Sequence, residues 1–198
     1  KTDQPEVEFK TTVGRINADL TVGSDVTAAE QLSANLGICH DGVKLHGAGF
    51  IVTPAQAEAL GLGKRLGLEA HIRSYRNGRD LAGTPRGAMV IDFFGLASAD
   101  VRARYPEAYQ HLLQSVKPNR EAVAAKSNSK DALEYARLWW IFGKPRQELR
   151  PALAGLQRFI ATVDTAKHRI FQFLPSEIIC DDKIVVVAAD DAMNLGTL

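Results

Sequence analysis

The chain has 198 residues, of which 45% are hydrophobic and 24% are charged, and its formal net charge is +1. This length and apolar content allow a buried core and exclude an intrinsically disordered chain. The near-zero net charge does not by itself indicate a nucleic-acid partner, since such proteins usually carry a basic excess.

The two cysteines, Cys39 and Cys180, lie far apart and have no neighbours at metal-ligand spacing. This pattern predicts neither a disulfide framework nor a zinc site, so we expect no metal, and it is typical of a cytoplasmic protein. The sequence contains no apolar run long enough to cross a membrane, so we expect no membrane partner. The start at Lys1 lacks the order of a signal peptide and suggests a segment of a longer protein.

In the first third of the chain, residues 12–26 have the apolar spacing of a strand, punctuated by glycines. A helix is predicted from Thr53 to Leu60. Thr53 is a good capping residue, Pro54 suits the first helical position, and Gln56 completes a capping box.

The next stretch combines a turn signal with cations. Asn77-Gly78 predicts a tight hairpin turn, with Arg76 and Arg79 on either side of it and Arg86 extending the basic tip. These arginines either contact phosphate or simply lie in solvent. The apolar run within residues 87–95 predicts a buried strand.

The second half begins with helices and ends with strands. Helices are predicted from Ser98 and through residues 109–116, ending at Lys117-Pro118, while the polar residues 119–130 predict an exposed helix or a loop. A helix at 131–141 and strands at 158–163, 169–174 and 184–189 complete the chain. The order predicts an α+β fold of mixed or antiparallel sheets with packed helices, as one domain or as lobes 1–116 and 117–198.

The cations are concentrated in two blocks. Residues 64–87 carry 6 Lys/Arg against 2 Asp/Glu, and residues 117–170 carry 11 against 5. If both blocks fold onto one face, they form a positive surface suited to a phosphate backbone. The alternative is that these side chains are ordinary solvent-exposed cations.

The acidic residues do not form a catalytic pattern with diagnostic spacing. Aspartates are paired at 181–182 and at 190–191, and a small metal-dependent nuclease or hydrolase that uses Asp181–Asp191 is the enzymatic alternative. A purely structural interaction lobe is a further alternative. The sequence lacks the glycine-rich turn that binds S-adenosylmethionine and the Asn/Asp-Pro-Pro-aromatic loop that holds a flipped base.

A set of short runs along the chain forms one further pattern: residues 16–23, 45–54, 73–80, 90–95, Trp139-Trp140 with 143–146, and 165–169. In order and spacing they resemble the C-terminal target-recognition region of type IIG (MmeI-like) restriction–modification enzymes and their DNA adenine-methyltransferase relatives. In that family one polypeptide carries a nuclease domain, a helical spacer, a methyltransferase domain and then this region.

The resemblance implies that residues 1–198 are a fragment that recognises a short sequence in double-stranded DNA. The catalytic centre for adenine-N6 methylation would then lie in a methyltransferase domain of the same polypeptide, outside this chain. S-adenosylmethionine is expected for that parent enzyme, and this chain is expected to hold no cofactor and no catalytic residue. Whether the chain is itself an enzyme, and whether the parent also cleaves DNA, stays open.

The residue types suggest how such a module would read DNA. Arg and Lys favour guanine, Asn and Gln favour adenine, and Asp and Glu favour cytosine. We expect base readout from a loop, a strand and the end of a neighbouring strand, through Lys167, His168, Arg169, Gln172 and Asp190. We expect contacts with the DNA backbone from Arg73, Arg76, Arg79, Lys144 and Arg146.

Strand alternation gives one further expectation about this region. It places Gln172 with His168 on one face and Phe171 with Phe173 on the other, which we expect to be the buried face. A solvated basic turn at 167–169 is the alternative to DNA contact.

Overall fold

The computed structural model describes residues 10–18, 20–23, 36–127 and 129–198, and the chain divides into two compact units, Lys1–Leu36 and Gly37–Leu198. In the first unit, Ile16 and Val22 form a single antiparallel bridge. In the part of 12–26 that the structure describes, this bridge is all that forms of the predicted strand. Residues 19 and 24–26 lie outside the described residues.

The second unit contains two four-stranded sheets. The first sheet is antiparallel throughout, in the order β1 (Cys39–Asp41), β8 (Ile184–Val187), β5 (Arg158–Val163) and β6 (Gln172–Pro175). The second is mixed, because β3 and β7 are parallel, and its order is β2 (Ile51–Val52), β4 (Met89–Ile91), β3 (Ile72–Arg76) and β7 (Ile179–Cys180). Both sheets combine strands from before and after Lys117.

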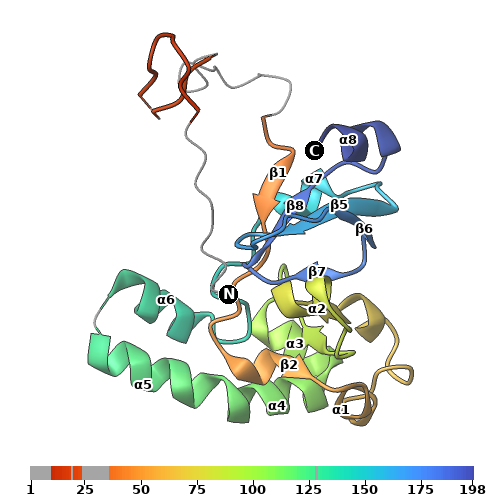
Figure 1. Ribbon diagram of the computed structural model, residues 1–198. Coiled ribbons are helices and arrows are strands. Elements are labelled where there is room, and N and C mark those ends of the chain that lie inside the picture. The colour runs from red at the N-terminus through yellow and green to blue at the C-terminus, as the bar shows by residue number, and fades with distance from the viewer. Residues whose placement is uncertain (1–9, 19, 24–35, 128) are drawn as a thin grey trace, which may run out of the picture. The chain divides into compact units, whose positions relative to one another are not determined.

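The helices lie between and beside these strands (Figure 1). Figure 1 shows the first sheet with α7 and α8 on one side of β7, and α3 to α6 on the other side. The described helices are α1 (Pro54–Ala59), α2 (Gly78–Ala82), α3 (Ser98–Arg104), α4 (Pro106–Ser115), α5 (Lys117–Ser127), α6 (Lys130–Arg137), α7 (Leu149–Ala152) and α8 (Ala192–Thr197), with 3-10 turns η3 (Ala48–Phe50) and η4 (Leu68–Ala70). The predicted α+β class is confirmed.

Each sheet has its own hydrophobic core. The second sheet packs with α3 and α4 through fully buried rings, including Phe93 and Tyr105, which stack with centroids 5.7 Å apart. The first sheet packs with α2 and α7 through Leu81, Phe159 and Ile184. Since burial of such side chains is the main driving force of folding, these two clusters fix the positions of the loops between them.

The sequence signals at Thr53 and at Asn77 have different outcomes in the structure. Thr53 and Gln56 form the predicted capping box at the start of α1. At Asn77 the predicted hairpin turn is wrong, because its Oδ1 accepts hydrogen bonds from the Arg79 and Asp80 N–H groups. Asp80 in turn accepts from the Asn77 N–H at 3.1 Å. An acid at the third helical position makes this Asn-Gly pair begin α2.

Arg120 of α5 is the largest departure from the exposed stretch expected at 119–130. Arg120 is only 5% exposed, and its guanidinium donates hydrogen bonds of 2.8 to 3.1 Å to five backbone carbonyl oxygens. Burial lowers the pKa of Arg120 to about 10, so the group is still a cation at neutral pH. The guanidinium joins α5 to the chain before η3 and to the end of α6, through Leu45, His46, Tyr135, Leu138 and Ile141.

Candidate nucleic-acid interface

The turn between β7 and β8 contacts both the first basic block, residues 64–87, and Lys44. The Tyr75 hydroxyl donates to Asp181 Oδ2 at 2.6 Å, and the Asp181 N–H donates to the Arg76 carbonyl at 2.9 Å. Burial, reinforced by the hydrogen bond to Asp181, raises the pKa of Tyr75, so its hydroxyl stays protonated. On the other side of the turn, Lys44 Nζ lies 3.6 Å from Asp182 Oδ2.

A groove of about 510 Å³ lies beside this turn, between α2 and the loop that follows β5. A Cβ on Gly78 would lie 3.3 Å from Val163 Cγ1, which shows how closely α2 approaches the end of β5. The cations that line the groove are Arg79, Arg86 and Lys183. They come from two stretches of the chain, residues 79–86 and the turn before β8, which folding brings together.

Arg86 is held on this groove by a buried carboxylate. Its Nε lies 2.9 Å from Asp80 Oδ1 and its Nη2 lies 2.9 Å from Asp80 Oδ2. These hydrogen bonds hold the pKa of Asp80 well below its usual range, against the opposing effect of burial. The Asp80 side chain is 1% exposed while that of Arg86 is 54% exposed, so the guanidinium is fixed yet accessible. Fixed geometry reduces the entropy lost when an anion binds.

The predicted readout loop lies on the other wall of the groove. Thr165 and Ala166 line it, and the next residues, Lys167, His168 and Arg169, are all exposed. Arg169 Nη2 donates to the Asp164 carbonyl at 3.1 Å, which closes the loop on itself. These exposed cations therefore lie next to a groove that is itself lined by cations.

Gln172 has a different environment from the one expected. The prediction that Phe171 and Phe173 lie on the buried face is wrong, because Leu174 is the buried residue of β6 and shares its parity with Gln172. The Arg158 guanidinium instead lies over the Phe173 ring, 3.8 Å from the ring centroid. The Gln172 amide donates to the Leu81 carbonyl at 2.8 Å, so it ties β6 to α2.

Asp190 is not brought together with the readout loop. It is exposed beyond the end of β8, and its carbonyl accepts a 2.9 Å hydrogen bond from Arg158 at the start of β5. The loop 164–171 follows the opposite end of β5, at Val163. The whole length of the strand, about 17 Å at the usual rise per residue, therefore lies between them.

The five residues predicted to contact the DNA backbone do not lie together. Arg79 lines the groove, and Arg76 lies at its edge beside Asp181. Lys144 is exposed and pairs through its backbone with Lys44, near the same turn. The other two form ion pairs with carboxylates: Arg146 with Asp41 at 2.9 Å, and Arg73 with Asp92 at 3.3 Å.

Sequence reasoning missed Lys183 and Lys44 as parts of this surface. Lys183 follows two aspartates, and such a run is read as an acidic turn. Its Nζ lies 3.8 Å from Asp164 Oδ2, at the root of the readout loop. No local signal in the sequence would have identified it, because its neighbours in space are distant in the chain.

The carboxylates that a nuclease or hydrolase would need do not lie together. Asp181 precedes β8 and Asp190 follows it, so the strand separates them. Asp191 caps α8 by accepting from the Asn194 N–H at 2.8 Å. Among the residues that the structure describes, no three His, Cys, Asp or Glu side chains are grouped to hold a metal ion.

Comparison with known proteins gives a structural match. No protein-family model matches the chain, and no curated protein matches it. A solved structure of the type IIL restriction-modification enzyme MmeI in complex with DNA matches with a TM-score of 0.66, at 16% identity. The chain shares its fold with part of MmeI. The match covers 93% of this chain but 24% of the MmeI chain, so it corresponds to about a quarter of that enzyme's length.

The match confirms, for the fold, the resemblance to MmeI-like enzymes seen in the sequence. It includes nearly all of this chain, and so both sheets. None of the helices within the described ranges is long and apolar enough to cross a membrane.

Proposed function

We propose that this chain is a sequence-specific, double-stranded DNA recognition module of a restriction–modification enzyme or of an adenine-N6 DNA methyltransferase. The observation that carries the proposal is the fold shared with part of MmeI, whose structure was solved in complex with DNA. A groove with three cations and an exposed basic loop supports it from the chain's own residues. Methyl transfer from S-adenosylmethionine would belong to another domain of the same polypeptide.

The proposed roles follow from position. Arg79, Arg86 and Lys183 would bind phosphates, since they line one groove. Lys167, His168 and Arg169 would read base edges from the adjoining loop. Asp190 lies at the other end of β5, so a contact by it would fall elsewhere on the duplex.

Binding by the full 198-residue chain tests the proposal directly. A selection from randomised duplexes should enrich a short motif, and fluorescence anisotropy should show affinity that falls steeply with salt. Replacing Lys167 and Arg169 with alanine should abolish the enrichment. Replacing Lys126, an exposed lysine on α5 outside the groove, should leave it unchanged.

The proposal fails if no motif is enriched and the affinity does not change with salt. It also fails if the Lys126 variant loses binding as strongly as the loop variant, because the contact would then be diffuse. Cleavage of DNA by this chain alone with magnesium would instead favour the nuclease alternative, for which the described carboxylates form no common site.

A further inference from the structure

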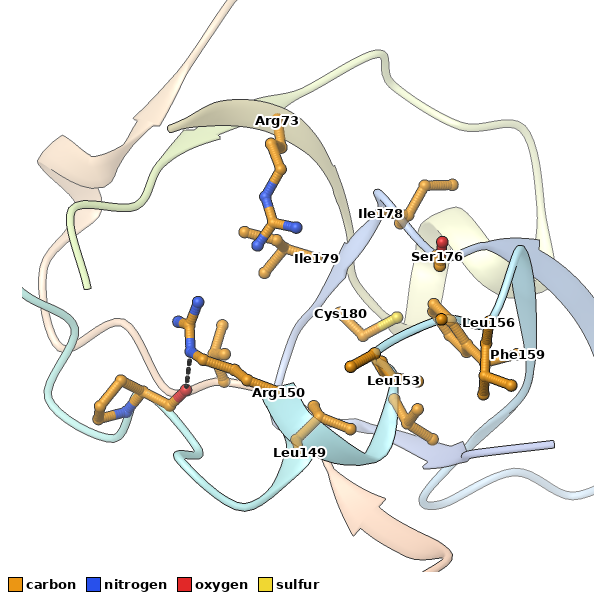
Figure 2. Close-up of a pocket in the computed structure, with 15 residues that line it drawn as sticks. Arg73, Leu149, Arg150, Leu153, Leu156, Phe159, Ser176, Ile178, Ile179 and Cys180 are labelled. Atoms are coloured by element: carbon orange, nitrogen blue, oxygen red, sulfur yellow. Dashed lines mark hydrogen bonds between the residues drawn. The ribbon is translucent and has the colours of Figure 1, made fainter. Parts of the chain in front are cut away.

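A cavity of about 300 Å³ lies between α7, β5 and β7 (Figure 2). It shares no lining residue with the groove beside α2, so the proposed DNA contacts do not use it. Its size is at the lower end of the range for small-molecule sites in proteins. Most of its wall is apolar, formed by Leu149, Leu153, Leu156, Phe159, Ile178 and Ile179.

One end of the cavity is cationic. Figure 2 shows the guanidinium groups of Arg73 and Arg150 at the same end, away from Leu156 and Phe159. Both arginines contact one carboxylate, that of Asp92: Arg150 at 2.8 and 3.2 Å, and Arg73 at 3.3 Å. Two cations thus share a single anion, which leaves this end with one uncompensated positive charge.

Arg150 is held firmly in place. Besides the paired hydrogen bonds to Asp92, its guanidinium lies 4.3 Å from the Phe94 ring centroid, and its Nε donates to the Pro145 carbonyl at 3.3 Å. A guanidinium fixed by a carboxylate, a ring and a carbonyl is preorganised for an anion at its open edge.

Arg73 has an unsatisfied donor. Its Nε is buried and has no hydrogen-bond partner. A buried donor without a partner is rare and costs free energy, since it has lost water and gained nothing. An oxyanion at this end of the cavity would pair with the uncompensated charge, and the Nε–H, which water does not reach, would join that contact only after a shift of the Arg73 side chain.

The opposite end offers no charge to repel or attract such a ligand. Cys180 lines the cavity between the two ends, and burial raises the pKa of its thiol to about 12, so it is neutral at physiological pH. Figure 2 shows Ser176 beside Ile178 on the same side. The far wall therefore fits an uncharged hydrocarbon body.

We propose that this cavity binds a small amphipathic carboxylate, with its head group at Arg73 and Arg150 and its apolar body against Leu153, Leu156 and Phe159. Inorganic phosphate, or the phosphate of a DNA backbone, satisfies the charge but leaves the apolar wall uncovered. An alcohol of the same length covers the wall but leaves the positive charge of this end unpaired.

Octanoate is a suitable probe, titrated into the full chain and followed by methyl chemical shifts. Saturable shifts are expected at Leu153, Ile178 and Ile179, with octan-1-ol and inorganic phosphate each binding about tenfold more weakly or less. The Arg73→Gln variant should weaken octanoate about tenfold, and the matched control, Arg102→Gln on the exposed face of α3, should bind as the parent does.

Equal binding of octanoate and octan-1-ol would overturn the proposal, because the cations would then contribute nothing. Equal binding of octanoate and phosphate would overturn it as well. If Arg73→Gln does not fold, the unmodified chain still decides: shifts at the exposed Leu66 and Val123 in place of the cavity methyls, or no saturation, refute the site.

Discussion

The Arg120 guanidinium donates to the carbonyl oxygen of Leu45 at 2.8 Å, across a separation of 75 residues in the chain. The four remaining carbonyl acceptors surround the same group, so one side chain satisfies backbone groups from two segments, 45–46 and 135–141. The Leu45 carbonyl also accepts from the Gly143 N–H at 3.2 Å and the Leu138 carbonyl from the Ile141 N–H at 3.0 Å, so at these two the guanidinium adds to backbone pairing.

Replacement of Arg120 by leucine should therefore be severe. It removes five hydrogen bonds to backbone carbonyls and should lower the free energy of unfolding by about 3 kcal/mol or more. Urea unfolding measures the loss. The matched control, Lys126→Leu, changes an exposed cation on the same helix and should stay within about 0.5 kcal/mol of the parent. Equal losses in the two variants would show that the carbonyl contacts contribute little.

The ion pair between Asp80 and Arg86 should make the free energy of unfolding depend on pH in the acid range. The folded-state pKa of Asp80 is depressed, so its contribution is complete above the unfolded pKa, about 3.9. The contribution is lost as the pH falls below that value, through the lower folded pKa. In urea unfolding at successive pH values, Asp80→Asn should be less stable at pH 7 and lose less stability below pH about 4 than the parent.

Glu58→Gln, an exposed carboxyl on α1, is the control for general acid effects. Its acid profile should follow that of the parent. An Asp80→Asn profile that also follows the parent would show that the contact with Arg86 does not set the acid dependence.

The salt dependence of DNA binding should separate the groove from the loop. Each phosphate contact contributes about 1 to the slope of log affinity against log salt, so Arg79→Ala and Lys183→Ala should each reduce it by about that amount. Both should weaken all duplexes alike. Loop variants at Lys167 or Arg169 should instead change which sequence is selected. A changed motif in the groove variants would contradict this division.

Gln172 provides a test of positioning against readout. Its amide already donates to Leu81 in the unbound chain, so Gln172→Met should cost about 1 kcal/mol of stability and weaken binding to every duplex. A base-reading role predicts a different result, namely lost preference for one base at one position of the selected motif. The selection experiment distinguishes the two.

The sequence predicted what depends on neighbours in the chain. The capping box at Thr53 was correct because its partners are three residues apart, and β5 was placed correctly by its apolar run. Asn77 was misread because the same dipeptide begins a helix when Asp80 follows. Arg120 was missed because its acceptors lie in segments that only the fold brings together.

The same limit applies to the candidate site. The basic blocks were visible in the sequence, and the loop at 167–169 is exposed as expected. The groove was not predictable, since it depends on the contact between Gly78 and Val163 and on the parallel pairing of β3 with β7. Arg73 illustrates the point: its charge suggested a phosphate contact, whereas its burial beside Asp92 places it in a separate cavity.

The antiparallel pairing of β1 with β8 joins the first and last strands described in the second unit. During synthesis, β1 leaves the ribosome long before its partner exists, so the first sheet cannot close until almost the whole unit has emerged. Contacts this distant in sequence make folding slow, and an unpaired strand edge is open to wrong partners in the meantime. The second sheet has β2, β3 and β4 available early, so we expect it to form first and the first sheet to be completed on it.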